Sequence, residues 1–378
     1  MYEFNEKAQD INNYKSYERN VSIDIIKTIA IFLIIMSHVL PLGYIKSGGR
    51  EYIDLTHASL NPVNFILQFT RYLGNIGNAL FIISSAWLLV DKNKVKYKKI
   101  IIMLLDYLII SLIFLMIFIL NKYNMSKSII LKQLAPSFFN LNWFIQCYAI
   151  FYMITPMLYI VKNNINKKQE EKFIKFFSIF IIWMFIRRDT RLYCDLIGFV
   201  YVYYVVDYIK KYRMQLIEDK RKNSIIFIAS ILLLVLFSFL VNFSGLKIGK
   251  LEDKALNFIT FINPFIMIVS FSTFLLIYNK NIKINKFNKI FTYISSLSLY
   301  IYVIHENDLI RNYARGDYFK FLYNNFNYNY IVLLCFISSI ITFIVSVIIA
   351  TIYKNTLHKG VVFITNKIYD EIKFKGEK

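Results

Sequence analysis

The chain has 378 residues, of which 57% are hydrophobic and 18% aromatic, and its formal net charge is +21 at pH 7. Its mean hydropathy of +0.47 is too high for an ordinary soluble domain and indicates a polytopic membrane protein. The Lys and Arg residues gather in short clusters between apolar runs, as in the cytoplasmic loops of membrane proteins. The positive charge therefore does not predict a nucleic-acid partner.

Ten apolar runs are long enough to be interpreted as membrane-spanning helices. The fold class is therefore predicted to be all-α, a polytopic membrane protein with about ten transmembrane helices. Residues 61–72 are amphipathic and are expected to lie at the membrane interface before the second span. The predicted spans cover residues 23–42, 73–90, 100–120, 143–161, 173–187, 196–209, 224–243, 258–278, 290–305 and 329–353.

The distribution of Lys and Arg predicts the orientation of these spans. With the N-terminus placed in the cytoplasm, the inner segments hold 29 of the 45 basic residues and the outer loops hold 14. This excess follows the positive-inside rule, so both termini are predicted to be cytoplasmic. The expected organisation is a cytoplasmic N-terminal segment (1–22), a transmembrane domain (23–353) and a basic cytoplasmic tail (354–378), in a cell membrane of bacterial type.

The first predicted span carries two ionisable residues, Lys27 and His38. Eleven residues make almost three helical turns, so both side chains project from one face about 16 Å apart along the axis. Ionisable groups inside a span usually face the bundle interior and mark function. The alternatives are that Lys27 reaches back to the cytoplasmic headgroups and that His38 only packs the end of the span. The spacing suits a phosphorylated cofactor whose anionic end meets Lys27 and whose reactive end reaches His38.

Four stretches in the same order resemble the acyltransferase-3 family of integral-membrane acyltransferases. The first is the spacing of Lys27 and His38, which matches that family's basic residue, ten residues, histidine signature. The resemblance extends over most of residues 19–306. The other three stretches are "GNIGNALFIISSAWLLV" (74–90), "NWFIQCYAIFYMITPML" (142–158) and "ISSLSLYIYVIH" (294–305).

This resemblance implies an activity and two roles. Members move acetyl or similar groups from acyl-CoA to hydroxyls of sugars, mostly on bacterial surface glycans. The expected donor is therefore acyl-CoA, with acetyl-CoA as the simplest case, and the expected acceptor is a surface polysaccharide or its lipid-linked precursor. His38 corresponds to the catalytic histidine and Lys27 to its partner basic residue. Whether His38 acts as a general base or is itself acylated stays open at this point.

The chain departs from the family pattern in two places. Ser84 is followed by Ser85 rather than by glycine, and the third span lacks a pair of basic residues three apart. If such a pair holds the phosphates of CoA, the contacts here would come from other cations. We expect Lys96, Lys98 and Lys99, which precede the third span, to make them.

Several polar residues are predicted to lie at the outer level beside His38. His305 closes the ninth span and is followed by Glu306, a carboxylate that can orient a neighbouring histidine. Trp143 opens the fourth span, as an interfacial anchor or as a platform for a sugar ring. These three are candidates for support of the base or for acceptor binding, and packing of the span end is the alternative for His305.

Outer basic residues give a further, weaker prediction. Arg187 and Arg188 run against the positive-inside trend and would attract an anionic glycan or a lipid pyrophosphate, unless headgroups neutralise them. Arg311 and Arg315 carry a similar but weaker indication, whereas Arg71 is expected only to anchor the interface. His57 and His358 are given no role. No metal site is predicted, because the four histidines lack the spacing of zinc ligands.

A different class of protein also fits a polar interior surrounded by about ten helices. An exporter that moves a lipid-linked glycan across the membrane would look similar at this level. Dependence on acyl-CoA separates the two, because a pure exporter needs none.

Overall fold

The computed structural model describes residues 20–40, 55–139, 142–187, 192–249, 252, 255–278, 282, 285–327 and 330–376. Over these residues the secondary structure is helical throughout, without a strand. The helices are α2 (Val21–Val39), α3 (Pro62–Leu89), α4 (Tyr97–Leu120), α5 (Lys127–Leu134), α6 (Trp143–Asn163), α7 (Lys167–Arg187), α8 (Leu192–Tyr212), α9 (Gln215–Glu218), α10 (Lys220–Lys247), α11 (Pro264–Ile277), α12 (Lys286–His305), the π-helical η2 (Ile310–Ala314), α13 (Arg315–Asn325), α14 (Ile331–Asn355) and α15 (Leu357–Gly376).

Each of the ten predicted spans falls on one of these helices. Six of them, namely α2, α3, α4, α6, α10 and α14, are long and apolar enough to cross a membrane. This confirms an all-α protein with several membrane-spanning helices. The count of ten crossings and the cytoplasmic location of both termini stay predictions.

The structure adds detail at two boundaries. The segment 61–72, predicted to lead into the second span, is continuous with it, because α3 runs without a break from Pro62 to Leu89. Most of the basic tail after Tyr353 forms the 20-residue helix α15. Asparagine residues account for several helix starts: the side chains of Asn20, Asn61 and Asn142 accept hydrogen bonds from the first backbone N–H groups of α2, α3 and α6.

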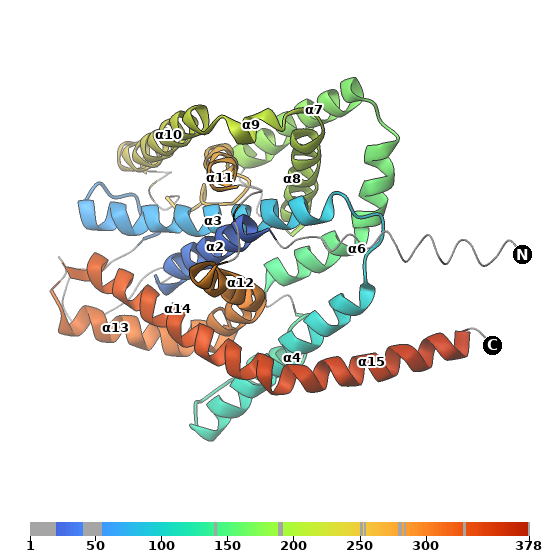
Figure 1. Cartoon of the computed structure of the whole chain (residues 1–378). Helices are drawn as coiled ribbons and strands as arrows, with labels where there is room; N and C mark the ends of the chain where they lie inside the picture. The colour runs from blue at the N-terminus through green and yellow to red at the C-terminus, as the bar shows by residue number, and fades with distance from the viewer. Residues whose placement is uncertain are drawn as a thin grey trace, which may run out of the picture.

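The centre of the fold is α2, which lies between α3 and α12 with α14 alongside (Figure 1). Twelve of its 19 residues are buried, among them Ile26 and Ile31, which have no exposed surface. Glycines of α3 allow the close approach of the two helices. A Cβ at Gly74 would lie 2.2 Å from Cβ of Ser37, and one at Gly77 would lie 2.5 Å from the carbonyl oxygen of Ala30. The glycine-rich motif of the second span thus serves to hold α3 against the helix that carries His38.

Buried charges at one end of the bundle are paired. The Lys162 ammonium lies 2.7 Å from Oδ1 of Asp207, and the Lys211 ammonium lies 2.6 Å from Oδ2 of the same carboxylate. Lys162 is on α6 and the other two are on α8, so the ion pairs join these helices. Pairing offsets part of the penalty of burying each charge, which explains how the predicted sixth span (196–209) can contain an aspartate.

A second polar cluster holds α15 in place. Asp106 of α4 accepts a hydrogen bond of 2.7 Å from the hydroxyl of Tyr353 and lies 3.0 Å from Nδ1 of His358, and the hydroxyl of Tyr300 is also within hydrogen-bonding distance. His358, which was assigned no role from the sequence, is therefore one of the residues that dock α15 on α4.

Candidate active site

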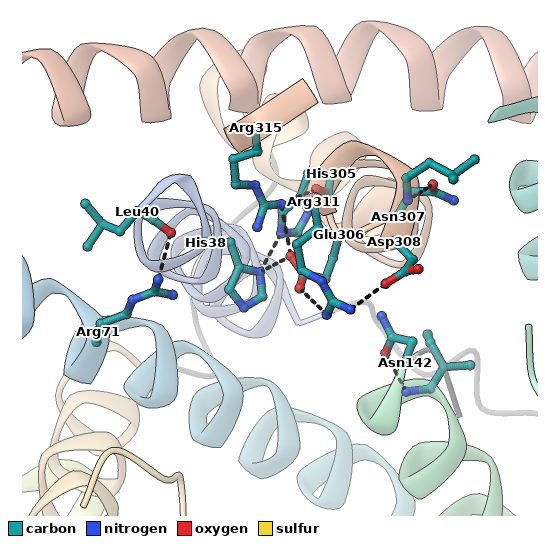
Figure 2. Close-up of polar contacts among 12 residues, drawn as sticks. His38, Leu40, Arg71, Asn142, His305, Glu306, Asn307, Asp308, Arg311 and Arg315 are labelled. Atoms are coloured by element: carbon teal, nitrogen blue, oxygen red, sulfur yellow. Dashed lines mark hydrogen bonds and ion pairs between the residues drawn. The ribbon is translucent and has the colours of Figure 1, made fainter. Parts of the chain in front are cut away.

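Two histidines meet where α2 and α12 end (Figure 2). His38 lies in the last turn of α2, and His305 is the last residue of α12. Nδ1 of His38 lies 3.1 Å from Nε2 of His305 and 3.0 Å from Oε2 of Glu306. The structure thus brings together three residues that the sequence placed at one level of the membrane, although 267 positions separate the two histidines.

The hydrogen bonds define which nitrogen of each ring carries a proton. Nδ1 of His305 lies 2.7 Å from the carbonyl oxygen of Ile301, and a carbonyl only accepts, so this nitrogen donates. In the neutral imidazole, Nε2 of His305 is then an acceptor. Nδ1–H of His38 therefore points to two acceptors, His305 and Glu306, and Nε2 of His38 is the nitrogen that has a lone pair for a substrate proton.

Arginines surround the carboxylate of Glu306. Nη2 of Arg315 lies 3.0 Å from Oε2, Nη1 of Arg311 lies 3.4 Å from Oε1, and Arg311 is held in turn by Asp308 at 2.5 Å. Burial raises the pKa of Glu306, but its interaction with His38 and the positive charge of Arg315 outweigh burial and hold this pKa well below its ordinary value. Glu306 is therefore ionised near neutral pH and able to stabilise a protonated His38.

The His38 side chain faces a cavity of about 460 Å³, named here the histidine cavity. Trp143 lines it and stacks on Phe261 with ring centroids 5.8 Å apart, which fixes the orientation of the indole at the cavity. Arg71 lines it as well. This residue is only 7% exposed and donates from Nη2 to the carbonyl of Leu40 at 2.7 Å, so the expectation of simple interface anchoring was wrong.

A second cavity, of about 290 Å³, lies around Lys27 and is named the lysine cavity. It is lined also by Lys92 and Lys99, together with Tyr148 and Tyr152. Both α3 and α6 line the lysine cavity and the histidine cavity, so the two cavities lie on the same side of α2. This agrees with the shared helical face inferred from the spacing of Lys27 and His38.

The three lysines predicted to contact CoA are not equivalent. Lys99 lines the lysine cavity. Lys96 is exposed at the start of α4, where its backbone N–H donates to the hydroxyl of Tyr152 at 3.3 Å. The ammonium of Lys98 lies 5.6 Å from the ring centroid of Tyr369 in α15. Of the three, the structure therefore places only Lys99 beside Lys27.

Three aromatic rings form a chain of contacts between Lys27 and His38, and we refer to Phe81, Phe144 and Tyr302 as the aromatic layer. The Lys27 ammonium lies 5.7 Å from the ring centroid of Phe81. Phe81 and Phe144 pack edge to face at 5.7 Å, Phe144 and Tyr302 lie 5.2 Å apart, and Tyr302 lies 6.5 Å from the ring of His38. A continuous column of rings therefore connects Lys27 to His38.

The outer arginines divide into two groups. Arg187 is exposed, lies over the ring of Trp183 at 5.8 Å and does not line the histidine cavity, and Arg188 lies outside the described residues. Arg311 and Arg315, which carried the weaker indication, line the cavity together with Arg71. Their position four residues apart after the conspicuous "HEN" stretch was the signal available in the sequence.

One set of side chains within the described ranges has the spacing of metal ligands. The ligand atoms of His38, His305 and Glu306 all lie within 4.8 Å of one another. Two guanidinium groups already contact the carboxylate and repel a cation. The hydrogen bonds between the three residues account for their arrangement, so the chemistry of this set fits a proton-transferring group better than a metal centre.

The helical, membrane-spanning fold and a carboxylate-bonded histidine that faces a polar cavity define an integral-membrane enzyme with a histidine centre. The comparison with known families identifies which one: the model of the acyltransferase-3 family, described as "Acyltransferase domain", matches residues 20–352, nearly the whole chain. The protein belongs to this family and is a membrane acyltransferase. No curated protein and no solved structure gave a significant match.

Proposed function

We propose that the protein transfers an acyl group, acetyl in the simplest case, from cytoplasmic acyl-CoA to a hydroxyl of a surface polysaccharide or its lipid-linked precursor. The observation that carries this proposal is the pair of cavities on one side of α2. Lys27 lines one and His38 lines the other, and the helical rise puts about 16 Å between them. An extended pantetheine arm covers a distance of this order.

The lysine cavity is the site for the anionic end of the donor. Lys27, Lys92 and Lys99 supply three positive charges there, and Lys side chains bind phosphate as point charges. This assignment replaces the set of three lysines taken from the sequence with one that the geometry supports. Under the predicted orientation, this cavity is on the cytoplasmic side, where acyl-CoA is present.

The chemistry follows from the hydrogen bonds of His38. Its Nε2 takes the proton of the acceptor hydroxyl, and the oxygen attacks the thioester carbonyl, forming the C–O bond. The C–S bond then breaks, and the imidazolium returns the proton to the thiolate of CoA. Glu306, 3.0 Å from Nδ1, holds the ring and stabilises its positive charge during the reaction. Acylation of His38 followed by transfer to the acceptor uses the same residues.

The guanidinium groups of the histidine cavity suit two tasks. Arg71, Arg311 and Arg315 line it beside His38, where a positive charge stabilises the negative oxygen that develops on the attacked carbonyl. Trp143 lies in the same cavity and offers a flat apolar face to a sugar. His305 acts on His38 alone and serves as a positioning residue.

The experiment follows labelled acetyl from acetyl-CoA into the surface glycan, in membranes that carry the wild type, His38→Ala or Lys27→Ala. We expect incorporation by the wild type, its loss in His38→Ala, and a partial loss in Lys27→Ala that excess donor restores. Full incorporation by His38→Ala would refute the assignment of the base. Absence of label from the wild type, while glycan export still depends on the protein, would favour the exporter instead.

A further inference from the structure

An apolar groove lies on the opposite side of the two histidines from the histidine cavity. It has a volume of about 470 Å³. Its lining comes mainly from α14, with smaller contributions from η2 and α13, and with Val39 and Ile304 at the side of α2 and α12. Ile341, Val345 and Ile349 of α14 line it and are 53%, 47% and 39% exposed. Because α14 is one of the helices able to cross the membrane, a groove along its exposed face opens to lipid tails.

Arg315 is the residue shared by the linings of the groove and the histidine cavity. His305 lines the groove, whereas its neighbour Glu306 lines the cavity. The polar and the apolar space are therefore divided by the catalytic cluster itself, with one guanidinium facing both. A ligand that occupies both spaces must pass this charge.

We propose that the apolar groove binds the hydrocarbon tail of a phosphate-bearing lipid, with the phosphate against Arg315 and the group attached to the phosphate in the histidine cavity. The proposal rests on the proposed function in one respect: the attached group is the acyl acceptor. It identifies the acceptor as lipid-linked at the moment of transfer, rather than as a finished polymer.

The charge of Arg315 is the reason for a phosphate rather than a neutral lipid. A guanidinium has five N–H donors, and the hydrogen bonds described for Arg315 come from Nη2, to the carbonyl of His305 at 2.6 Å and to Glu306 at 3.0 Å. The remaining N–H groups match the geometry of phosphate oxygens. A neutral lipid would bury its head beside this charge without forming such bonds.

The test measures binding to the full-length protein in phosphatidylcholine nanodiscs. The probe is a long-chain polyisoprenyl monophosphate that carries a photoreactive diazirine in its tail. Irradiation should label peptides of α13 and α14 from the groove. Val345→Trp fills the groove and should lower this labelling at least fivefold. Thr342 also lines the groove, so Thr342→Trp is a second variant that should lower the labelling.

Ile344→Trp is the matched control, because Ile344 is 52% exposed on the same helix but does not line the groove. It should leave the labelling unchanged. Unlabelled polyisoprenyl monophosphate should compete with the photoreactive probe, and Arg315→Gln should weaken this competition about tenfold. In the wild type, the corresponding polyisoprenyl alcohol should compete at least tenfold less well than the monophosphate.

Two results would overturn the proposal. One is equal labelling of Val345→Trp, Thr342→Trp and Ile344→Trp. The other is equal competition by the alcohol and the monophosphate, which would mean that bulk membrane lipid fills the groove. The labelling needs no acyl-CoA, so a protein that binds the probe but transfers no acyl group would contradict the proposed function and leave the groove assignment intact.

Discussion

Replacing Glu306 with Gln tests the central feature of the site, because it removes a charge and preserves the size of the side chain. Oε2 of Glu306 lies 3.0 Å from Nδ1 of His38, and the two side chains are 11% and 21% exposed. With an effective dielectric constant of about 20, a carboxylate and an imidazolium at this distance attract each other by roughly 5 kcal/mol. This attraction exists only when His38 is protonated, which happens during the reaction.

The loss should therefore appear in kcat. Solvent screening and the remaining amide contact reduce the effect to about 3–4 kcal/mol, which corresponds to a decrease of about 10²–10³-fold. For comparison, removing the carboxylate from a serine-protease triad lowers kcat by about 10⁴. The KM for acyl-CoA should change less than threefold, because the lysine cavity shares no lining residue with the histidine cavity.

The assay measures initial rates of acyl transfer by the purified, reconstituted protein over a range of acyl-CoA concentrations. Asp308→Asn is the control, because Asp308 also bonds Arg311 but has no described contact with His38. It should lower kcat less than fivefold. If Glu306→Gln retains a third or more of the wild-type kcat, or if Asp308→Asn loses as much, the carboxylate does not act through His38.

Three further predictions follow from other contacts. Gly77→Ala should lower the free energy of unfolding by about 1–3 kcal/mol, because the added Cβ would lie 2.5 Å from a carbonyl oxygen of α2. Thermal unfolding measures this loss. Gly360→Ala is the control and should show no such loss, because its Cβ would meet nothing within 4 Å. Lys27→Met should raise the KM for acyl-CoA about tenfold or more with little change in kcat, whereas Lys96→Met, outside the lysine cavity, should leave it within twofold. Because the pKa of Glu306 is lowered in the fold, ionised Glu306 should stabilise the protein above the pKa of the unfolded chain, about 4.3, and this stabilisation should be lost as the pH falls through the lower pKa of the folded state. The Tm of the wild type should therefore fall below about pH 4. Glu306→Gln should lack this part of the decrease in Tm.

Local patterns in the sequence predicted the positions of the helices. They also predicted the relative positions of residues on the same helix. The length of the apolar runs located the helices, and the spacing of Lys27 and His38 placed both on the side of α2 that faces α3 and α6. The predicted level of His305 was close enough to suggest contact with His38. Helical geometry alone carries such inferences, since it fixes both rotation and rise per residue.

Contacts between distant helices were beyond this reasoning. Arg71 was expected at the interface, because its burial depends on the chain near Leu40, to whose carbonyl it donates. His358 was given no role, because its partner Asp106 lies 252 positions away. Lys96 and Lys98 have the same charge and nearly the same place as Lys99, and only the rotation of α4 against its neighbours decides which of them faces Lys27.

The aromatic layer has a consequence for the membrane as a whole. An enzyme that takes its donor from one side and its acceptor from the other needs a passage through the bilayer, and an open aqueous passage would let ions and protons run down their gradients. In the resting protein, Phe81, Phe144 and Tyr302 lie between Lys27 and His38. Under the proposed function, these rings would move aside for a slim thioester arm, which would then occupy the space they leave. The substrate would thus take the place of the rings, so that acyl transfer across the membrane would open no aqueous channel.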